Sequence, residues 1–348
     1  MIWLTWRQFR IQSWGTLAIL AVLAVILAVT GLHLADLYNT AGVAACQAHS
    51  DCATLASGFL NQFGAGVYQP LLYGTVAVLL IAPAIMGAFW GAPLVTRELD
   101  AGTFPLAWNQ SVTRTRWMAV KLGLIGLAAM LTAGLLSLMA TWWGSPIERA
   151  SQLAVSRNGS SSINWFVPVL FAAHGVAPIG YAVFAFTLGV TAGVLIRHTV
   201  PAMAATLAVY AGVQIAVPLW IRPHLMAPLR HMAPLQAGAV DLLNVSPNGQ
   251  MTVSAGVNLP GAWILSNQTI SPDGHPFTGP ATTACQSAAG SMQACAASIT
   301  RLHLRQLVIY QPASRFWTFQ WYETGLFLVV ALALAGFCLW WVRRRRLA

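Results

Sequence analysis

The side chains whose types and spacing could do chemistry gather in one polar stretch, Leu94 to Lys121, between two long apolar runs. A solvated loop at a membrane surface would explain its arginines, but not the mixed charge at residues 97–100. We therefore interpret the stretch as a compact, charged, helix-forming loop at one face of a membrane, whose role these residues alone leave open. Its charged residues are Arg97, Glu98, Asp100, Arg114, Arg116 and Lys121.

The middle of this stretch predicts a short helix. Thr103 can cap a helix that begins near Phe104–Pro105, because proline suits the first helical turn. We expect this helix to end near Gln110 and to lie parallel to the membrane. Thr113 can then cap the next apolar helix.

Motifs of soluble enzymes are missing from the sequence. It contains no Walker A loop, no HExxH zinc motif, no GxSxG nucleophile elbow and no dinucleotide-binding glycine fingerprint. His224 and His231 are seven residues apart in a proline-rich segment, which is a poor spacing for zinc. We therefore expect no catalytic residue, no metal site and no cofactor on this chain.

Composition indicates a membrane protein. Hydrophobic residues make up 57% of the chain and charged residues 7%, whereas soluble domains carry about 25% charged residues. A membrane helix needs about 20 mainly apolar residues. The predicted fold is a single all-α integral membrane domain, residues 1–348, with six transmembrane helices at about residues 14–34, 69–92, 117–143, 165–196, 200–221 and 321–342.

Residues 1–13 combine aromatic, basic and aliphatic side chains ahead of the first span. This pattern predicts an interfacial helix anchored at headgroup depth, with a simple extension of the first span as the alternative. The following apolar run is too long for a cleaved signal peptide, so we expect it to be retained.

The distribution of basic residues predicts the orientation. With an even number of spans, both termini share one side of the membrane. The basic residues on that side lie in short segments and are Arg7, Arg10, Arg97, Arg114, Arg116, Lys121, Arg197 and Arg343–Arg346. The positive-inside rule makes this side cytoplasmic. The net charge of +10 then indicates anionic lipid rather than nucleic acid as the partner.

Four of the five cysteines fall on the opposite, outer side. Cys46 and Cys52 lie in the first outer loop, and Cys285 and Cys295 in the last. Because thiols oxidise outside the cytosol, we expect the local disulfides Cys46–Cys52 and Cys285–Cys295, one of three possible pairings. Four free thiols are the alternative.

Residues 222–315 form the longest predicted loop, between spans 5 and 6. Its many Pro, Gly, Ser, Thr and Asn residues predict turns, and residues 284–308 could form one or two helices. We expect a small outer cap over the membrane domain.

Two features concern the packing of the spans. Pro168, Gly175 and Pro178 interrupt the fourth region, which predicts a kinked helix or a re-entrant piece that leads into one. The GxxxG pairs Gly87/Gly91 and Gly189/Gly193 are suited to close helix contact.

The spans carry few ionisable residues. His174 lies deep in a span and is interpreted as a hydrogen-bonded kink residue, and Glu323 near the outer end of the last span as an interfacial anchor. Ion-coupled transporters need buried ionisable groups along their path, so proton relay is not expected. The energy for transport would then come from outside the chain.

At the polar stretch the sequence resembles the ABC-2 type family of ABC transporter permeases. The matching features are E-x-x-x-G-T at Glu98–Thr103, the short helix that follows, T-R-x-R at Thr113–Arg116, and Lys121 entering the third span. In that family this segment is a cytoplasmic coupling helix between spans 2 and 3, which docks on a separate ATPase subunit. The cysteine-containing outer loops and the long last loop depart from the simplest bacterial members.

The resemblance implies two copies of this chain in a bacterial plasma membrane, with cytoplasmic termini, and two ABC-type ATPase copies that carry ATP and Mg. It implies outward transport of a hydrophobic or amphiphilic cargo, such as a drug, lipid, peptide or secondary metabolite, along a path lined by spans 1, 2 and 5. The implied ATPase-contacting residues are Arg97, Glu98, Asp100, Gly102, Thr103, Pro105, Leu106, Trp108, Arg114 and Arg116.

Two other classes stay open from the sequence. One is an ion-coupled secondary transporter or channel, for which mutation of His174 and Glu323 would abolish proton-driven flux. The other is a membrane sensor or enzyme that acts through its outer loop.

Overall fold

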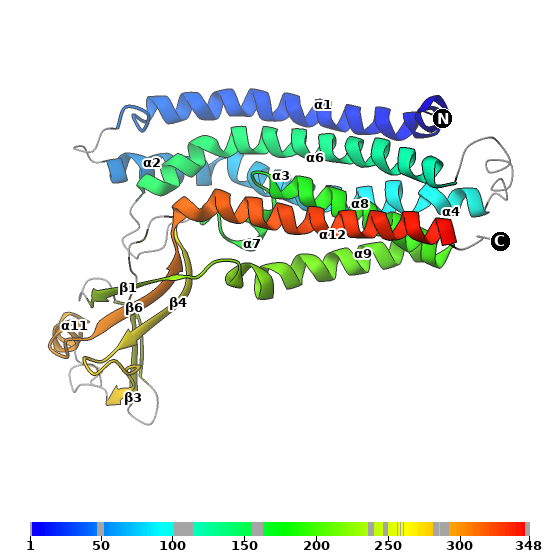
Figure 1. Cartoon of the computed structure of the whole chain (residues 1–348). Helices are drawn as coiled ribbons and strands as arrows, with labels where there is room; N and C mark the ends of the chain where they lie inside the picture. Colours follow the sequence, from blue (N-terminus) through cyan, green and yellow to red (C-terminus); the bar gives the residue numbers. More distant parts are fainter. Residues whose placement is uncertain are drawn as a thin grey trace.

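The computed structural model describes residues 2–46, 52–100, 114–154, 163–235, 240–245, 250–255, 257, 259, 261–280, 285 and 292–344. This part of the chain is mostly helical and contains six segments that are long and apolar enough to cross a membrane (Figure 1). The predicted helical membrane fold is thus confirmed. The segments are Trp14–Thr40, Tyr68–Arg97, Thr115–Leu153, Ala177–Ile196, Thr199–His224 and Ala313–Arg344.

Four of the spans contain one main helix each: α1 (Ile2–Thr40), α6 (Arg114–Leu153), α8 (Ala177–Ile196) and α12 (Phe316–Arg344), which follows the 3-10 turn η5 (Ala313–Arg315). The other two contain a wider π-helical turn. They consist of α3 (Tyr68–Ile85), η1 (Met86–Gly91) and α4 (Pro93–Asp100), and of α9 (Thr199–Ala216), η2 (Val217–Ile221) and η3 (Arg222–His224). Pro83 precedes η1 and Pro218 lies within η2. Because proline removes a backbone donor and clashes with the preceding turn, local departures from α-helical geometry are expected at these places.

Helix α1 is continuous from Ile2 to Thr40. Residues 2–13 are therefore the first turns of the same helix, which is the extension that we considered as the alternative to a separate interfacial helix.

A further helix, α2 (Cys52–Ala65), lies in the predicted first outer loop. Its buried residues Ala56, Phe59 and Phe63 recur at helical spacing, so they lie on one face. The Phe59 ring packs edge-on against Tyr38 of α1, with 5.5 Å between centroids. Helix α2 also packs against α6.

The fourth predicted region is divided into a short helix, α7 (Pro168–Ala172), and the long helix α8. Helix α8 is the centre of the bundle: 67% of its apolar window is buried, against 22% in the first, fifth and sixth spans. It contacts α3, η1, α4, α6, α9 and α12.

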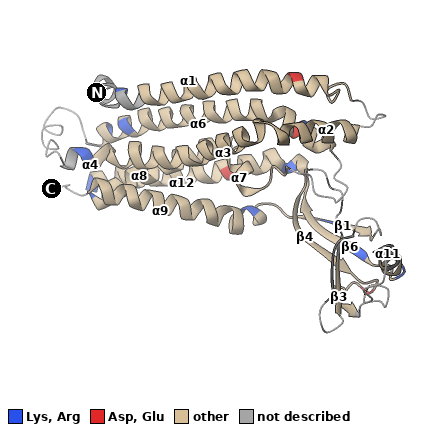
Figure 2. Ribbon diagram, turned by 180° about the vertical axis from the view of Figure 1, so that it is seen from behind, with Lys and Arg blue, Asp and Glu red and all other residues tan. Residues whose placement is uncertain are grey.

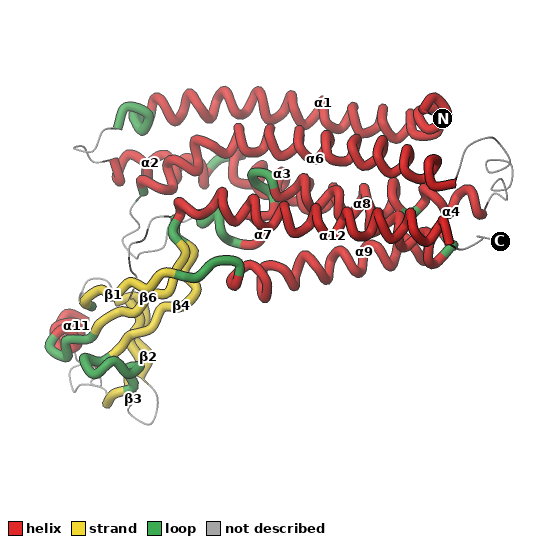
Figure 3. The backbone as a smooth tube through the Cα atoms, in the orientation of Figure 1, coloured by secondary structure: helices red, strands yellow, loops and turns green. Residues whose placement is uncertain are grey.

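The predicted outer cap contains β-structure, so the all-α description is wrong for this part of the chain (Figure 3). One antiparallel sheet has the order β1-β6-β4, and the other has the order β2-β3-β5. A helix, α11 (Met292–Thr300), is present in residues 284–308, but residues 305–308 belong to a strand. The strands are β1 (Leu229–Pro234), β2 (Val240–Val245), β3 (Gln250–Ala255), β4 (Trp263–Ile270), β5 (Gly279–Pro280) and β6 (Arg305–Gln311).

The cap has its own small core. Met251, Val253 and Ala255 alternate along β3 and are buried together with Ile299 of α11 and Leu304. Most of the strands are only six to eight residues long and they lie among turn-rich segments, which explains why their period-2 pattern is hard to recognise in the sequence.

The cap is joined to the bundle by the fifth and sixth spans. Strand β1 follows η3, strand β6 leads into α12, and the two strands pair from Leu229–Tyr310 to Pro234–Arg305. The Gln311 amide nitrogen donates to the Met226 carbonyl at 2.8 Å, and Arg315 Nη1 donates to the Ala227 carbonyl at 2.7 Å. The cap is therefore continuous with α9 and α12.

The two ends of the bundle differ in charge (Figure 2). The basic end holds both termini, α4 and the described basic residues Arg10, Arg97, Arg116, Arg197, Arg343 and Arg344, and the cap end holds the sheets. Both predicted cysteine pairs lie at bonding distance and at the cap end, with Cα–Cα distances of 5.7 Å for Cys46–Cys52 and 4.8 Å for Cys285–Cys295.

Candidate functional site

The predicted ATPase-contacting segment enters and leaves the basic end of the bundle through α4 and α6. Arg97 at the end of α4 and Arg116 at the start of α6 are both exposed. Glu98, Asp100 and Arg114 occupy helical positions. The predicted helix at 104–110 lies outside the described residues, as do Gly102, Thr103, Pro105, Leu106 and Trp108.

Helix α4, the first of these two stems, is firmly packed. Leu94, Val95 and Thr96 are buried. The Thr199 hydroxyl at the start of α9 donates to the Thr96 hydroxyl at 2.7 Å, and Thr96 donates to the Ala92 carbonyl at 3.2 Å. Thr96 therefore links α4 to the start of α9.

The second stem places Lys121 inside the bundle. Its side chain is buried, and its ammonium lies 4.3 Å from the centroid of the Trp117 ring. Such a cation–π contact offsets part of the cost of burying the charge.

The two predicted GxxxG pairs face each other where η1 meets α8. A Cβ added to Gly189 would lie 2.0 Å from the Gly87 carbonyl oxygen, and one added to Gly91 would lie 2.4 Å from the Phe186 carbonyl oxygen. A Cβ at Gly193 would lie 2.5 Å from the Ala92 carbonyl oxygen. Only glycine permits this approach of two backbones, so the prediction of close helix contact is confirmed.

Helix α8 is in turn fixed to α12 and α7. Gln320 of α12 accepts a hydrogen bond from the Ala177 amide at 2.8 Å and donates to the Phe171 carbonyl at 2.9 Å. These bonds satisfy backbone groups on both sides of the break at 173–176, where Gly175 has a positive φ of 67°. The predicted interruption of the fourth region is thus stabilised by a side chain of the sixth span.

A buried ion pair joins the fifth and sixth spans at the cap end. Arg222 Nε and Nη2 donate to the Glu323 carboxylate at 2.8 and 3.0 Å, and the two side chains are 0% and 1% exposed. The Tyr181 hydroxyl of α8 donates to the same carboxylate. The Arg222 guanidinium also lies 3.9 Å from the centroid of the Phe171 ring of α7. Four segments of the bundle therefore converge on one charged pair.

This pair corrects two predictions. Glu323 is not an interfacial anchor, and Arg222, predicted as the first residue of the outer loop, is buried inside the bundle. One signal was present in the sequence: Arg222 ends the fifth apolar run and Glu323 lies near the start of the sixth, so opposite charges occur at similar depth on two spans. Ionisable residues at membrane depth are expected to be paired and functional.

His174 lies in the break between α7 and α8. It is buried, its Nε2 is 3.6 Å from Glu148 Oε2, and its ring lies 4.7 Å from that of Trp165. We predicted that His174 is a hydrogen-bonded residue at a kink. It lies at the break, but its Nε2 makes no hydrogen bond among the described residues.

The described residues contain no group of three His, Cys, Asp or Glu side chains that could hold a metal ion.

One family model, described as ABC-2 membrane transporter related, matches residues 17–222. The matched region contains the first five spans and both stems, and it ends at Arg222, before the cap. No curated protein and no solved structure matches the chain.

Proposed function

Because the chain belongs to the ABC-2 membrane transporter related family, we propose that it is the membrane-spanning permease subunit of an ATP-driven ABC exporter. Its partner would be a separate ABC-type ATPase that binds ATP and Mg. The observation that carries the proposal is the family match over residues 17–222, which includes the two stems of the charged segment.

The packing of the second span supports a coupling role for that segment. Residues 97–116 begin in the last turn of α4 and end in the first turn of α6, and η1 next to α4 is packed backbone to backbone against α8. Helix α8 contacts the second, third, fifth and sixth spans. A push on residues 97–116 would thus act on the centre of the bundle. Arg97, Glu98, Asp100, Arg114 and Arg116 would supply charged contacts with the ATPase, and Pro105, Leu106 and Trp108 the apolar contact.

The same connections lead to the cap. Tyr181 of α8 donates a hydrogen bond to Glu323, and Glu323 accepts hydrogen bonds from Arg222 at the base of the cap. Since α9 and α12 continue into β1 and β6, movement of α8 would change the angle of the cap. ATP-driven motion at the basic end would in this way open a path at the cap end.

A path lined by spans 1, 2 and 5 requires a second copy of the chain. Figures 1 and 2 both place α1 and α9 at opposite edges of the bundle, so one copy cannot enclose such a path. In a homodimer, α1 of one copy would approach α9 of the other. Their exposed faces are apolar, including Val22 and Val29 on α1 and Val209 and Ile215 on α9, which favours a hydrophobic or amphiphilic cargo.

The charge difference between the ends supports an orientation with the basic end, and hence both termini, in the cytoplasm. The cap and both cysteine pairs would then lie on the outer side of a bacterial plasma membrane, where disulfides persist.

The test is to tag the chain, purify it from its native membranes in mild detergent, and identify the proteins that co-purify. We expect an ABC-type ATPase, and we expect vesicles that contain both proteins to move an amphiphilic dye only with hydrolysable ATP. Recovery of the chain without an ATPase, together with ATP-independent flux, would overturn the proposal.

An ion-coupled carrier is the second candidate, and the burial of Glu323 favours it. A carboxylate in a span could bind and release a proton if Arg222 moved away. For this candidate, Glu323→Gln abolishes proton-driven flux in vesicles that contain this chain alone. For the exporter, such vesicles show no flux with either residue at position 323.

A further inference from the structure

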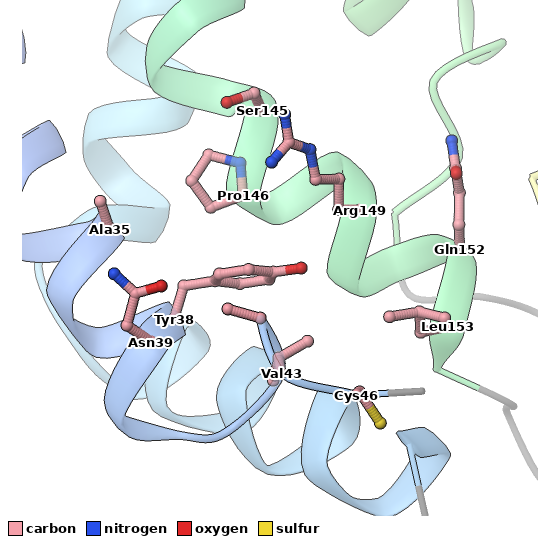
Figure 4. A pocket seen from close by; sticks show the side chains of 11 residues that line it. Ala35, Tyr38, Asn39, Val43, Cys46, Ser145, Pro146, Arg149, Gln152 and Leu153 are labelled. Carbon is pink, nitrogen blue, oxygen red and sulfur yellow. The ribbon is translucent and has the colours of Figure 1, made fainter. Parts of the chain in front are cut away.

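A pocket of about 560 Å³ opens at the cap end between α1, the turn after α1, and the last turns of α6 (Figure 4). Its volume is within the range of ligand-binding sites, roughly 300–1,000 Å³. It is separate from the Arg222–Glu323 pair, the glycine contact and the charged segment, and none of these uses its residues. Figure 4 shows the Tyr38 ring extending from α1 toward α6, below Pro146 and Arg149.

The polar side chains of the pocket share one property: each carries a hydrogen-bond donor, and among the described residues no carboxylate lines the pocket. The Ser145 hydroxyl already donates to the Trp142 carbonyl at 2.9 Å. Arg149 supplies a positive charge. Among the described residues, neither the Arg149 guanidinium nor the Tyr38 hydroxyl has a hydrogen-bond or ion-pair partner. The polar residues that line the pocket are Tyr38, Asn39, Ser145, Arg149 and Gln152.

This set of groups fits an oxygen-rich anion. A guanidinium matches phosphate and carboxylate oxygens with paired hydrogen bonds, and neutral hydroxyl and amide donors can satisfy the remaining oxygens. The other half of the lining, which includes Ala35, Val43, Pro146 and Leu153, is apolar. A fully hydrated inorganic ion would leave that half without a partner.

The surroundings of the pocket indicate what is attached to the anion. One turn closer to the membrane centre, Leu32 of α1 and Trp142 of α6 are 66% and 50% exposed. The Trp142 ring packs on α1 so closely that a Cβ at Gly31 would lie 2.7 Å from it. Exposed tryptophan marks the depth of the headgroups, and exposed leucine marks acyl chains. The pocket therefore lies where a polar headgroup ends and a hydrocarbon chain begins.

We propose that this pocket binds the headgroup of an anionic phospholipid from the leaflet at the cap end, with the phosphate on Arg149 and an acyl chain along Leu32 and Trp142. The inference goes beyond the exporter function, because it concerns a lipid bound at the α1–α6 edge and does not depend on an ATPase or on the direction of transport.

The experiment uses the full chain purified in a non-ionic detergent. Binding of phosphatidylglycerol and of phosphatidylcholine with the same acyl chains is measured by native mass spectrometry. We expect the wild-type chain to retain phosphatidylglycerol preferentially. Arg149→Gln should weaken that binding about tenfold, as the loss of one charge-assisted hydrogen bond predicts. Arg230→Gln removes an exposed charge in the cap and should change nothing.

Two further arms separate a lipid from a soluble anion. Leu32→Asn, at the expected acyl-chain contact, should weaken phosphatidylglycerol binding. Glycerol phosphate without acyl chains should not compete at the same concentration. Equal retention of both lipids, equal binding by Arg149→Gln and Arg230→Gln, or full competition by glycerol phosphate would each overturn the assignment. Because Arg149 is exposed, its substitution should leave the unfolding temperature unchanged, which is checked on the same samples.

Discussion

Arg222 and Glu323 are 101 residues apart in the sequence, yet the guanidinium of one makes two hydrogen bonds to the carboxylate of the other. The cap is inserted between them, so this contact closes the base of the cap inside the bundle. Tyr181 and Phe171 complete the cluster from α8 and α7. The connection of the cap to the membrane domain thus depends on a buried charge pair as well as on apolar packing.

The first prediction concerns single and paired substitutions at this site. Removing one partner leaves the other charge buried, which costs about 3–5 kcal/mol. Arg222→Met and Glu323→Gln should therefore each lower the unfolding temperature in detergent, whereas Arg222→Met with Glu323→Leu should recover much of the loss. The exposed cap variant Arg230→Gln is the control. If the double variant unfolds at as low a temperature as the two single variants, the ion pair is not what stabilises this junction.

The second prediction concerns the contact between η1 and α8. Gly189→Ala places a methyl group 2.0 Å from the Gly87 carbonyl oxygen, so the two spans must separate. We expect the free energy of unfolding to fall by about 1–3 kcal/mol, which is observed as a lower unfolding temperature in detergent. We also expect transport to be lost.

The matched control is Gly212→Ala, which lies in α9 with open space around its added methyl group. Alanine is the better helix former by roughly 0.5–1 kcal/mol, so this variant should be neutral or slightly stabilised. If both variants unfold at the same temperature, close backbone contact is not required.

Part of this architecture could be read from the sequence because it depends on local composition. The lengths of the apolar runs predict six spans, and the GxxxG pairs predict close contact, which Gly87 and Gly189 make with each other. The cysteine pairs follow from short separation in the chain. The charged segment is recognisable by its motif, but the helix predicted at its centre lies outside the described residues.

Other features depend on tertiary structure. Which arginine meets Glu323 is decided by how the fifth and sixth spans approach each other, and single-sequence periodicity does not report that. Helix α2 was missed although Ala56, Phe59 and Phe63 give a helical pattern, because it is shorter than a span. In the cap, β1 pairs with β6, which lies more than 70 residues further along the chain, and local sequence does not report such a long-range pairing.

The third prediction tests coupling through the charged segment. Loss of a charged contact buried at an interface costs about 2–5 kcal/mol. Glu98→Arg should therefore reduce co-purification of the ATPase, or leave it bound while transport no longer responds to ATP. Asp273→Arg makes the same charge change in the exposed part of the cap and should do neither. Unchanged co-purification together with unchanged ATP-dependent transport in Glu98→Arg would remove Glu98 from the coupling contact.

The fourth prediction concerns which end of the bundle faces the cytoplasm. Arg116→Cys at the basic end and Asp273→Cys in the cap both replace exposed side chains, so a charged maleimide reagent can reach either one from its own side. Because the positive-inside rule places clustered arginines in the cytoplasm, we expect intact cells to label only Asp273→Cys. Arg116→Cys should be labelled only after the membrane is permeabilised. Cys338 is buried and the other four cysteines are paired, so the wild-type chain gives the background signal. Labelling of Arg116→Cys in intact cells would place the charged segment outside, where no ATP-driven partner could reach it.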